Sequence, residues 1–392
     1  MKKIFFSLFL FFTFFNSAIF AQEDYRVLFL KGNIIDKINA VRKASDEGAV
    51  WVTNKAIDFV LENKKILNDD REIDSLAVAA ILATSNDYIN SLSTFEKNEL
   101  LNRYIQMFNT FENSSNVQIA IISKVTPMKD TVDLKPFVSL LNNFIAKKNP
   151  AVTDVSVYKS VINSLAVLGN NTSFTSLYNS LNDNSYAVLY PEIERTVVQL
   201  IPVSMDEVLQ ITHSKNINQI SKILDLIKKN NDISSKFLSE IAENILNESI
   251  LLLDNSSGDS KALVGIQMEA LQILNDNKWT RASESVISFY EVAKFEYSSG
   301  VMTEDQYITV IKTLPNIAPI TSVNNLIRTL GELNISIEIQ QDVSEAVVLA
   351  VINSLGTIGD KSAFDALLSV TYLNYPETVL SAARVALAGL KW

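Results

Sequence analysis

Few side chains in this sequence could do chemistry, because the chain contains one histidine and no cysteine. His213 alone cannot build a zinc site of the usual His/Cys kind, and the HExxH spacing does not occur. A serine triad would need the same histidine, and the G-x-S-x-G motif is missing. His213 lies where a helix is expected to end, and a histidine there more often caps the helix than acts as a base. We therefore predict no catalytic role for His213.

The segment Asp254–Asp259 has the composition of a calcium loop but not its register. Such a loop needs glycine at its sixth position and glutamate at its twelfth. Counted from Asp254, Gly258 is fifth and Gly265 is twelfth. A loop between two helices fits the segment better, and no glycine-rich phosphate loop occurs elsewhere. We expect neither a metal nor a cofactor.

Paired carboxylates are the remaining catalytic candidates. Inverting glycoside hydrolysis needs two of them across a cleft, usually beside aromatic platforms for the sugar. The three tryptophans are far apart in the sequence, and the acidic groups lie at expected helix starts or on polar faces, where solvation is their usual role. A secreted all-α toroid acting on carbohydrate therefore stays as the alternative function. The residues concerned are Trp51, Trp279, Trp392, Asp69, Asp70, Glu72, Asp74, Glu240, Glu243 and Glu248.

Three tyrosines, Tyr178, Tyr186 and Tyr190, gather near Phe174. Aromatic side chains in a surface groove are common anchors for a protein partner. At helical spacing they can equally well fill the core. The sequence leaves both interpretations open, and the three tyrosines are our candidate partner-binding residues.

Residues 1–21 have the pattern of a secretory signal peptide: a basic start, an apolar run over 4–15 and a small residue, Ala21, before a charged stretch. Cleavage is expected after Ala21, with Ala18 as the alternative site. A retained anchor is the other alternative, since the apolar part is close to the lower limit of about 17 residues for a span. No later segment approaches that limit, so we expect an exported mature chain in the periplasm or outside the cell, without an integral span.

The charge balance bears on the partner. The net charge is −10, and removal of Lys2 and Lys3 with the signal makes it −12. Nucleic acid and anionic lipid both require clustered Lys and Arg, so neither is expected. A protein of the cell envelope that carries basic patches fits this balance better. The lack of disulfides does not argue against export, because a chain of this length can bury an adequate core without them.

The sequence repeats itself over a long interval. The pentamer VINSL occurs at residues 161–165 and again at 351–355, which is 190 residues later. In both copies an apolar helical run stops at a glycine, and a second run follows a short polar turn. The matching residues beyond the pentamer are Gly169 and Gly359, Phe174 and Phe364, and Leu177 and Leu367.

Similar helical runs close at intervals of 32 to 44 residues, with one interval of 73 that equals about two periods. Periods of about 40 residues with two helices each are typical of HEAT and armadillo arrays, whereas tetratricopeptide repeats need about 34 residues and a different pattern. Asn- and Asp-rich clusters such as 113–116, 182–184 and 230–232 mark the expected breaks between helices. The runs close near Leu82, Val125, Leu168, Ile201, Leu274, Leu314, Ile358 and Leu390.

The chain resembles a degenerate HEAT-repeat protein. The family's second helix ends in Leu-Gly or Ile-Gly-Asp, as Leu165–Gly169 and Leu355–Asp360 do, and Pro376–Leu390 is similar to its Ala-rich helix. The sequence departs from the family at Val348 and Leu380, where regular repeats carry arginine. The clear matches cover about 151–181 and 335–392.

This resemblance implies an all-α, right-handed superhelix of antiparallel helix pairs. We expect a divergent helical region over 22–116 that continues into the repeats of 117–392, which end in a capping helix. The implied function is that of a non-catalytic scaffold that binds a protein, or of a structural component of the envelope. The apolar last helix also allows self-association through the terminal repeats.

Overall fold

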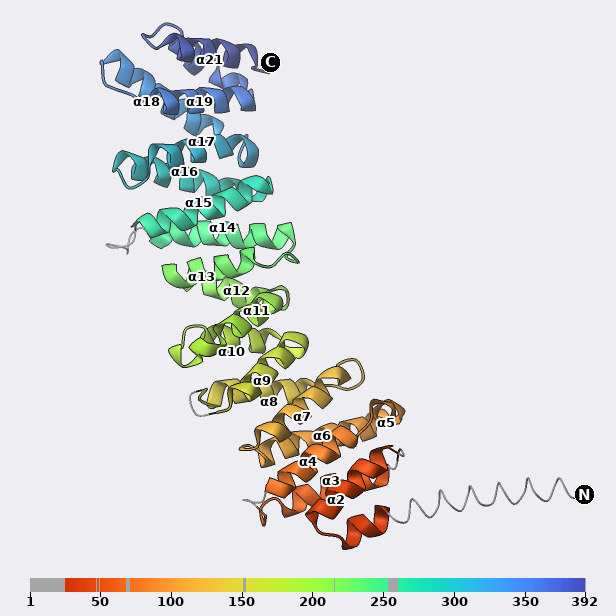
Figure 1. Ribbon diagram of the computed structural model, residues 1–392. Coiled ribbons are helices and arrows are strands. Elements are labelled where there is room, and N and C mark those ends of the chain that lie inside the picture. Colours follow the sequence, from red (N-terminus) through yellow and green to blue (C-terminus); the bar gives the residue numbers. More distant parts are fainter. Residues whose placement is uncertain are drawn as a thin grey trace, which may run out of the picture. The chain divides into compact units, whose positions relative to one another are not determined.

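The computed structural model describes residues 25–46, 48, 50–67, 71–150, 153–214, 216–252 and 260–391. Throughout these residues the chain is helical and contains no β-strand, and consecutive helices pack against each other (Figure 1). The predicted all-α repeat fold is therefore confirmed. The expected signal peptide, the Asp254–Asp259 loop, Asp69, Asp70 and Trp392 lie outside the described residues.

The helices form two compact units that divide between Ser204 and Met205. In unit 1 one row of helices, α2, α4, α7, α9 and α11, packs each on the next, and α3, α6, α8 and α10 form a second row beside it. The bounds are α2 (Ile34–Asp46), α3 (Val50–Asn63), α4 (Arg71–Ala83), α5 (Asn86–Ser91), α6 (Thr94–Thr110), α7 (Ser115–Val125), η1 (Thr126–Met128), α8 (Lys135–Lys147), α9 (Val155–Leu168), α10 (Asn171–Ser180), η2 (Asn184–Leu189), α11 (Tyr190–Leu200) and η3 (Ile201–Val203).

Unit 2 repeats this arrangement. Helices α13, α15, α17, α19 and α21 form one row, and α12, α14, α16, α18 and α20 form the other. The bounds are α12 (Met205–Thr212), α13 (Ile217–Lys228), α14 (Ser235–Leu252), α15 (Ser260–Asp276), η5 (Thr280–Ala282), α16 (Ser283–Ser298), α17 (Glu304–Ile317), α18 (Val323–Glu338), α19 (Glu345–Ile358), η6 (Lys361–Ala363), α20 (Phe364–Val370) and α21 (Glu377–Ala388).

The predicted helix ends agree closely with the structure. Helices α7, α9 and α19 end at the expected residues, Val125, Leu168 and Ile358, and α4 ends one residue after Leu82. The long interval of 73 residues contains one further row helix, α13, as two periods require. Residues 25–31 are helical. Within the described part of the chain, no helix combines the length and apolarity that a membrane span requires.

The core of each unit lies between its two rows, and the rows supply different side chains. Most buried aromatic residues come from the second row, for example Tyr104 on α6, Phe137 on α8 and Phe289 on α16, whereas Tyr158 on α9 and Tyr307 on α17 belong to the first. The first row supplies small or branched residues such as Ala77 and Val161. Because small residues let helix axes approach, the first-row helices pack closely on one another while the aromatic rings fill the space between the rows.

The two VINSL copies occupy equivalent places, in α9 and α19. Each buries its serine, and the hydroxyl bonds to the preceding helix of the same row. Ser164 Oγ lies 2.7 Å from Thr126 Oγ1, just after α7, and Ser354 Oγ donates to the Ile311 carbonyl of α17 at 3.2 Å. The repeated serine therefore satisfies its own polar group while fixing one repeat against the next.

Such polar contacts recur along both units. The side chains join positions 32 to 43 residues apart, which is one repeat, although the arginine of regular HEAT arrays is absent at Val348 and Leu380. Different residue types make the contact at each step, so the repeats are linked irregularly. Examples are Lys124 to the Thr84 carbonyl, Lys148 to Glu112, Lys159 to Glu192, Arg195 to Asn163, Lys228 to Glu269, Tyr290 to Thr329 and Tyr375 to Asn334.

The packing around Gly356 shows how closely α19 and α21 approach each other. A Cβ atom added there would lie 2.9 Å from Ala386 Cβ and 3.1 Å from its Cα, closer than such atoms pack. Helical Gly→Ala changes normally stabilise by about 0.5–1 kcal/mol, but here we expect Gly356→Ala to lower the free energy of unfolding by about 1–3 kcal/mol, because the two helices must separate. Urea unfolding followed by circular dichroism measures the difference.

The matched control is Gly331→Ala in α18, where an added Cβ would meet no atom within 4 Å. We expect this variant to be more stable than the wild type by about 0.5–1 kcal/mol. Equal stabilisation by both substitutions would show that α19 and α21 are not in close contact.

Candidate functional site

A groove of about 1090 Å³ lies on the first-row helices α2, α4 and α7 of unit 1 and reaches the start of α9. Its apolar lining residues include Val78, Leu82 and Ala83 of α4 and Ile119 of α7, and we call these four residues the floor. Leu82 is 60% exposed, although it is a large apolar residue in the middle of a row. The floor therefore offers apolar surface that the described residues of unit 1 leave exposed.

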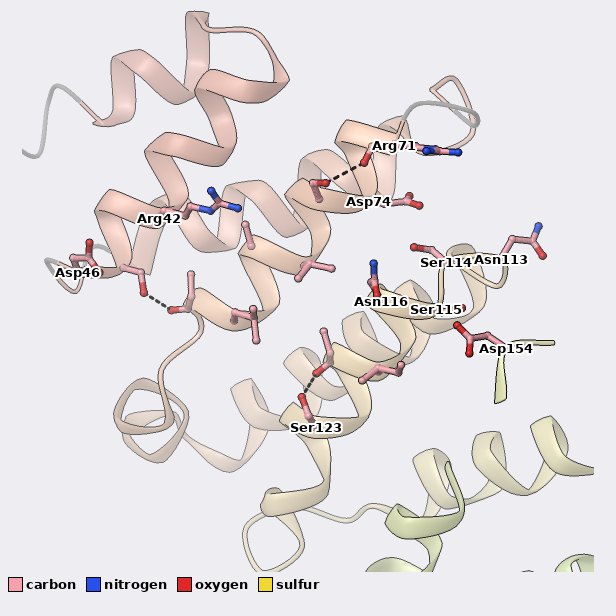
Figure 2. A pocket seen from close by; sticks show the side chains of 18 residues that line it. Arg42, Asp46, Arg71, Asp74, Asn113, Ser114, Ser115, Asn116, Ser123 and Asp154 are labelled. Carbon is pink, nitrogen blue, oxygen red and sulfur yellow. Dashed lines mark hydrogen bonds between the residues drawn. The ribbon is translucent and has the colours of Figure 1, made fainter. Parts of the chain in front are cut away.

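Polar side chains surround this floor. Figure 2 shows Arg42 and Asp46 on α2 at one end, and Arg71 and Asp74 at the start of α4. The other end is formed by residues 113–116 at the start of α7 and by Asp154, the N-cap of α9. The groove thus combines an apolar floor with a rim of both charge signs.

The acidic groups of the rim differ in how far they are already engaged. Asp74 Oδ1 pairs with Lys64 Nζ at 2.7 Å. The Ser156 N–H, together with the hydroxyls of Ser115 and Ser156, lowers the pKa of Asp154, so this carboxylate is ionised at neutral pH. Among the described residues, Arg42 and Arg71 form no ion pair, and their guanidinium groups remain available to a bound partner.

The lining of the groove has the composition of a binding surface. Its carboxylates Asp46, Asp74 and Asp154 lie at separate places on the rim, and Asp74 pairs with Lys64. Within the described ranges, no group of three or more His, Cys, Asp or Glu side chains is placed to hold a metal ion. An apolar floor inside a polar rim is the usual composition of a protein-binding surface.

Sequence reasoning missed the groove because its residues are spread over most of unit 1 and each resembles an ordinary polar helix face. One signal was available. The cluster Asn113–Asn116 and the N-cap Asp154 mark the starts of consecutive helices in one row, and the starts of parallel neighbours come together.

The tyrosines proposed as anchors lie mainly in the core. Tyr178 and Tyr186 are 3% and 6% exposed, and Tyr190 is half-buried. The Tyr186 hydroxyl donates to the Ile145 carbonyl at 2.5 Å, and its ring packs edge-on against Tyr158. This placement favours the core-filling interpretation for Tyr178 and Tyr186, and leaves Tyr190 as the tyrosine of the three that a partner can reach.

His213 has an acidic neighbour that the sequence did not reveal. Its Nδ1 lies 2.7 Å from Glu248 Oε1 of α14, and the histidine side chain is half exposed. Two other acidic candidates on α14 are also engaged. Glu243 accepts from Trp279 Nε1 at 2.8 Å, and Glu240 lies 3.3 Å from Arg281 Nη1. These glutamates join α14 to neighbouring repeats.

The chain was compared with known families and proteins. No family model matches it, and no curated protein matches it.

Glu296 of α16 is a buried carboxyl group of unit 2. Its side chain is 2% exposed, and among the described residues neither carboxylate oxygen has a hydrogen-bond partner. Burial raises the pKa of this carboxyl to about 7. The ionised form is costly in such a place, so folding favours the protonated acid.

This shift predicts a pH-dependent stability. Below pH 4.5 the folded and unfolded states both hold the proton, and Glu296 costs nothing. Between pH 4.5 and 7 the unfolded state ionises first, so unit 2 loses up to about 3 kcal/mol from this group as the pH rises. We expect Glu296→Gln to remove this loss, and urea unfolding at pH 4.5 and pH 8 measures it.

The variant should resemble the wild type at pH 4.5 and exceed it in stability at pH 8. Glu338→Gln, which changes an exposed glutamate at the end of α18, controls for the loss of charge alone. A parallel pH dependence in wild type and Glu296→Gln would contradict the raised pKa.

Proposed function

We propose that this protein is an exported, HEAT-like repeat scaffold that binds another protein of the cell envelope and does no catalysis. The groove of unit 1 is the single observation on which the proposal depends most. Its exposed floor around Leu82 offers a partner apolar contact, and Arg42 and Arg71, which form no ion pair among the described residues, offer charge recognition.

The repeat architecture supports the same function. Stacked helix pairs expose long rows of side chains that the core does not need, and arrays of this kind commonly bind partners along such rows. The α14 glutamates that could have served an enzyme acting on carbohydrate are held in contacts between repeats, and no specific observation favours that alternative.

A photo-crosslinking experiment tests the groove. The full chain would carry a benzophenone amino acid at position 82 in place of Leu82, and would be irradiated in its own cell envelope. We expect a discrete crosslinked protein, because this exposed floor position would lie against the bound partner. Mass spectrometry identifies the product.

Val188 of η2, which is also exposed, provides the matched control position. A second control combines the probe with Arg42→Ala and Arg71→Ala, and we expect the crosslink to weaken severalfold. The same products from both probe positions, or no product together with turnover of an envelope glycan, would refute the scaffold proposal.

Export is tested separately by the N-terminus of the protein recovered from its cells. Cleavage after Ala21 predicts a chain that begins at Gln22, and cleavage at the alternative site predicts Ile19. Mass spectrometry of the N-terminal peptide distinguishes the two. A chain that retains Met1 would contradict cleavage and favour the anchor.

A further inference from the structure

In unit 2 the second-row helices α16, α18 and α20 end at one edge, where short turns lead into α17, α19 and α21 (Figure 1). We call residues 295–305, 335–345 and 370–378 the turn edge. They contain the last turn of α16, the end of α18 and the three turns with the helix starts that follow. Every residue of the turn edge belongs to the described part of the chain.

Large apolar side chains are exposed at each of these three segments. Phe295 on α16 is 70% exposed, Ile335 and Ile339 at the end of α18 are 58% and 60% exposed, and Tyr372 after α20 is 79% exposed. One such residue is ordinary on a protein surface, but a series that recurs at each repeat forms a stripe.

Hydrogen bonds fix the three segments beside each other. Lys294, which precedes Phe295, pairs with Glu332 of α18. The Tyr375 hydroxyl in the last turn donates to Asn334 Oδ1 at 3.1 Å, next to Ile335. The exposed apolar residues therefore lie on adjacent elements and not at scattered places.

The turn edge is also acidic. Its three segments contain no Lys or Arg. Two cations lie close by, and both are already in ion pairs: Lys294 with Glu332, and Arg384 with Glu377. Some of the acids stabilise the helix starts on which they lie, but Glu338 and Asp342 are in no first turn. The exposed acidic residues are Glu304, Asp305, Glu338, Asp342, Glu345 and Glu377.

We propose that the turn edge docks a cationic amphipathic segment of a partner protein. The apolar face of that segment packs on Phe295, Ile335, Ile339 and Tyr372, and its Lys or Arg side chains meet the surrounding carboxylates. This chemistry excludes acidic peptides and anionic lipid surfaces. This proposal rests on the scaffold function in one respect, namely that the partner is a polypeptide. It uses no residue of the groove.

A defined probe tests this surface on the full chain. The probe is a labelled peptide of about 18 residues with Leu and Lys at helical spacing, about 27 Å long as a helix, which spans three helices packed about 9 Å apart. We expect saturable binding by fluorescence anisotropy that weakens as the salt concentration rises. A peptide with Glu in place of every Lys should not bind.

Two triple variants separate the contributions. Phe295→Ser, Ile335→Ser and Tyr372→Ser should together weaken binding at least about tenfold. Asp305→Asn, Glu338→Gln and Asp342→Asn should weaken it and flatten its salt dependence. The control is Ile66→Ser with Val188→Ser, two equally exposed apolar residues of unit 1, and we expect it to bind like the wild type. Circular dichroism checks that each variant is folded.

Several outcomes would overturn the proposal. These are no binding of the Lys peptide, equal binding of the Glu peptide, or unchanged binding by both edge variants. Sedimentation velocity would identify a second copy as the occupant if the wild type were a dimer and the apolar variant a monomer. Capture of the chain by neutral phosphatidylcholine vesicles through the same residues would identify a membrane. Failure of the Leu82 crosslink leaves this test unaffected, so the two proposals can fail independently.

Discussion

The structure depends on one constraint: a pair of helices of this length cannot bury its apolar faces by itself. Each pair in a unit gains its core from the pair before and the pair after it, so the rows of helices form one continuous apolar interior. The close packing at Gly356 and the buried aromatic residues of the second row are local expressions of this constraint. Stability therefore resides in the contacts between repeats more than within any one of them.

The polar contacts between repeats add less to stability than that packing does, but they fix the position of each helix along its neighbour. Ser164 and Ser354 come from identical pentamers, yet one bonds to a threonine hydroxyl and the other to a backbone carbonyl. Apolar packing tolerates small shifts of one helix along another, whereas a hydrogen bond requires defined geometry. Irregular partners of this kind make each repeat fit its own neighbours best.

The two surfaces have a common origin in this architecture. Each row must keep certain helix faces apolar for stacking. The remaining faces and turns take no part in stacking, so their residues are released from that requirement. In unit 1 the released positions form the groove on the first row, and in unit 2 they form the turn edge of the second. Exposed Leu82 and Phe295 both lie where no neighbouring repeat covers them, so their apolar character has no role in stacking.

The sequence by itself determined the helical class, the period and most helix boundaries. Those properties are local: apolar spacing sets a helix face, and residues such as Asn170 or Gly359 begin or end the helix through their own backbone preferences. Gly359, where the helical run was expected to stop, ends α19 in the left-handed conformation, with φ of 73°.

The tertiary structure alone decided which side chains meet. It placed Tyr186 in the core, paired His213 with Glu248 and assembled the groove from Arg42, Leu82 and Asp154. It also buried Glu296 without a hydrogen-bond partner among the described residues. The periodicity of a helix specifies its apolar face, but not the rotation and displacement between that helix and one about 40 residues away. Contacts across a repeat depend on those two quantities, and they arise only when all the side chains of neighbouring helices pack together.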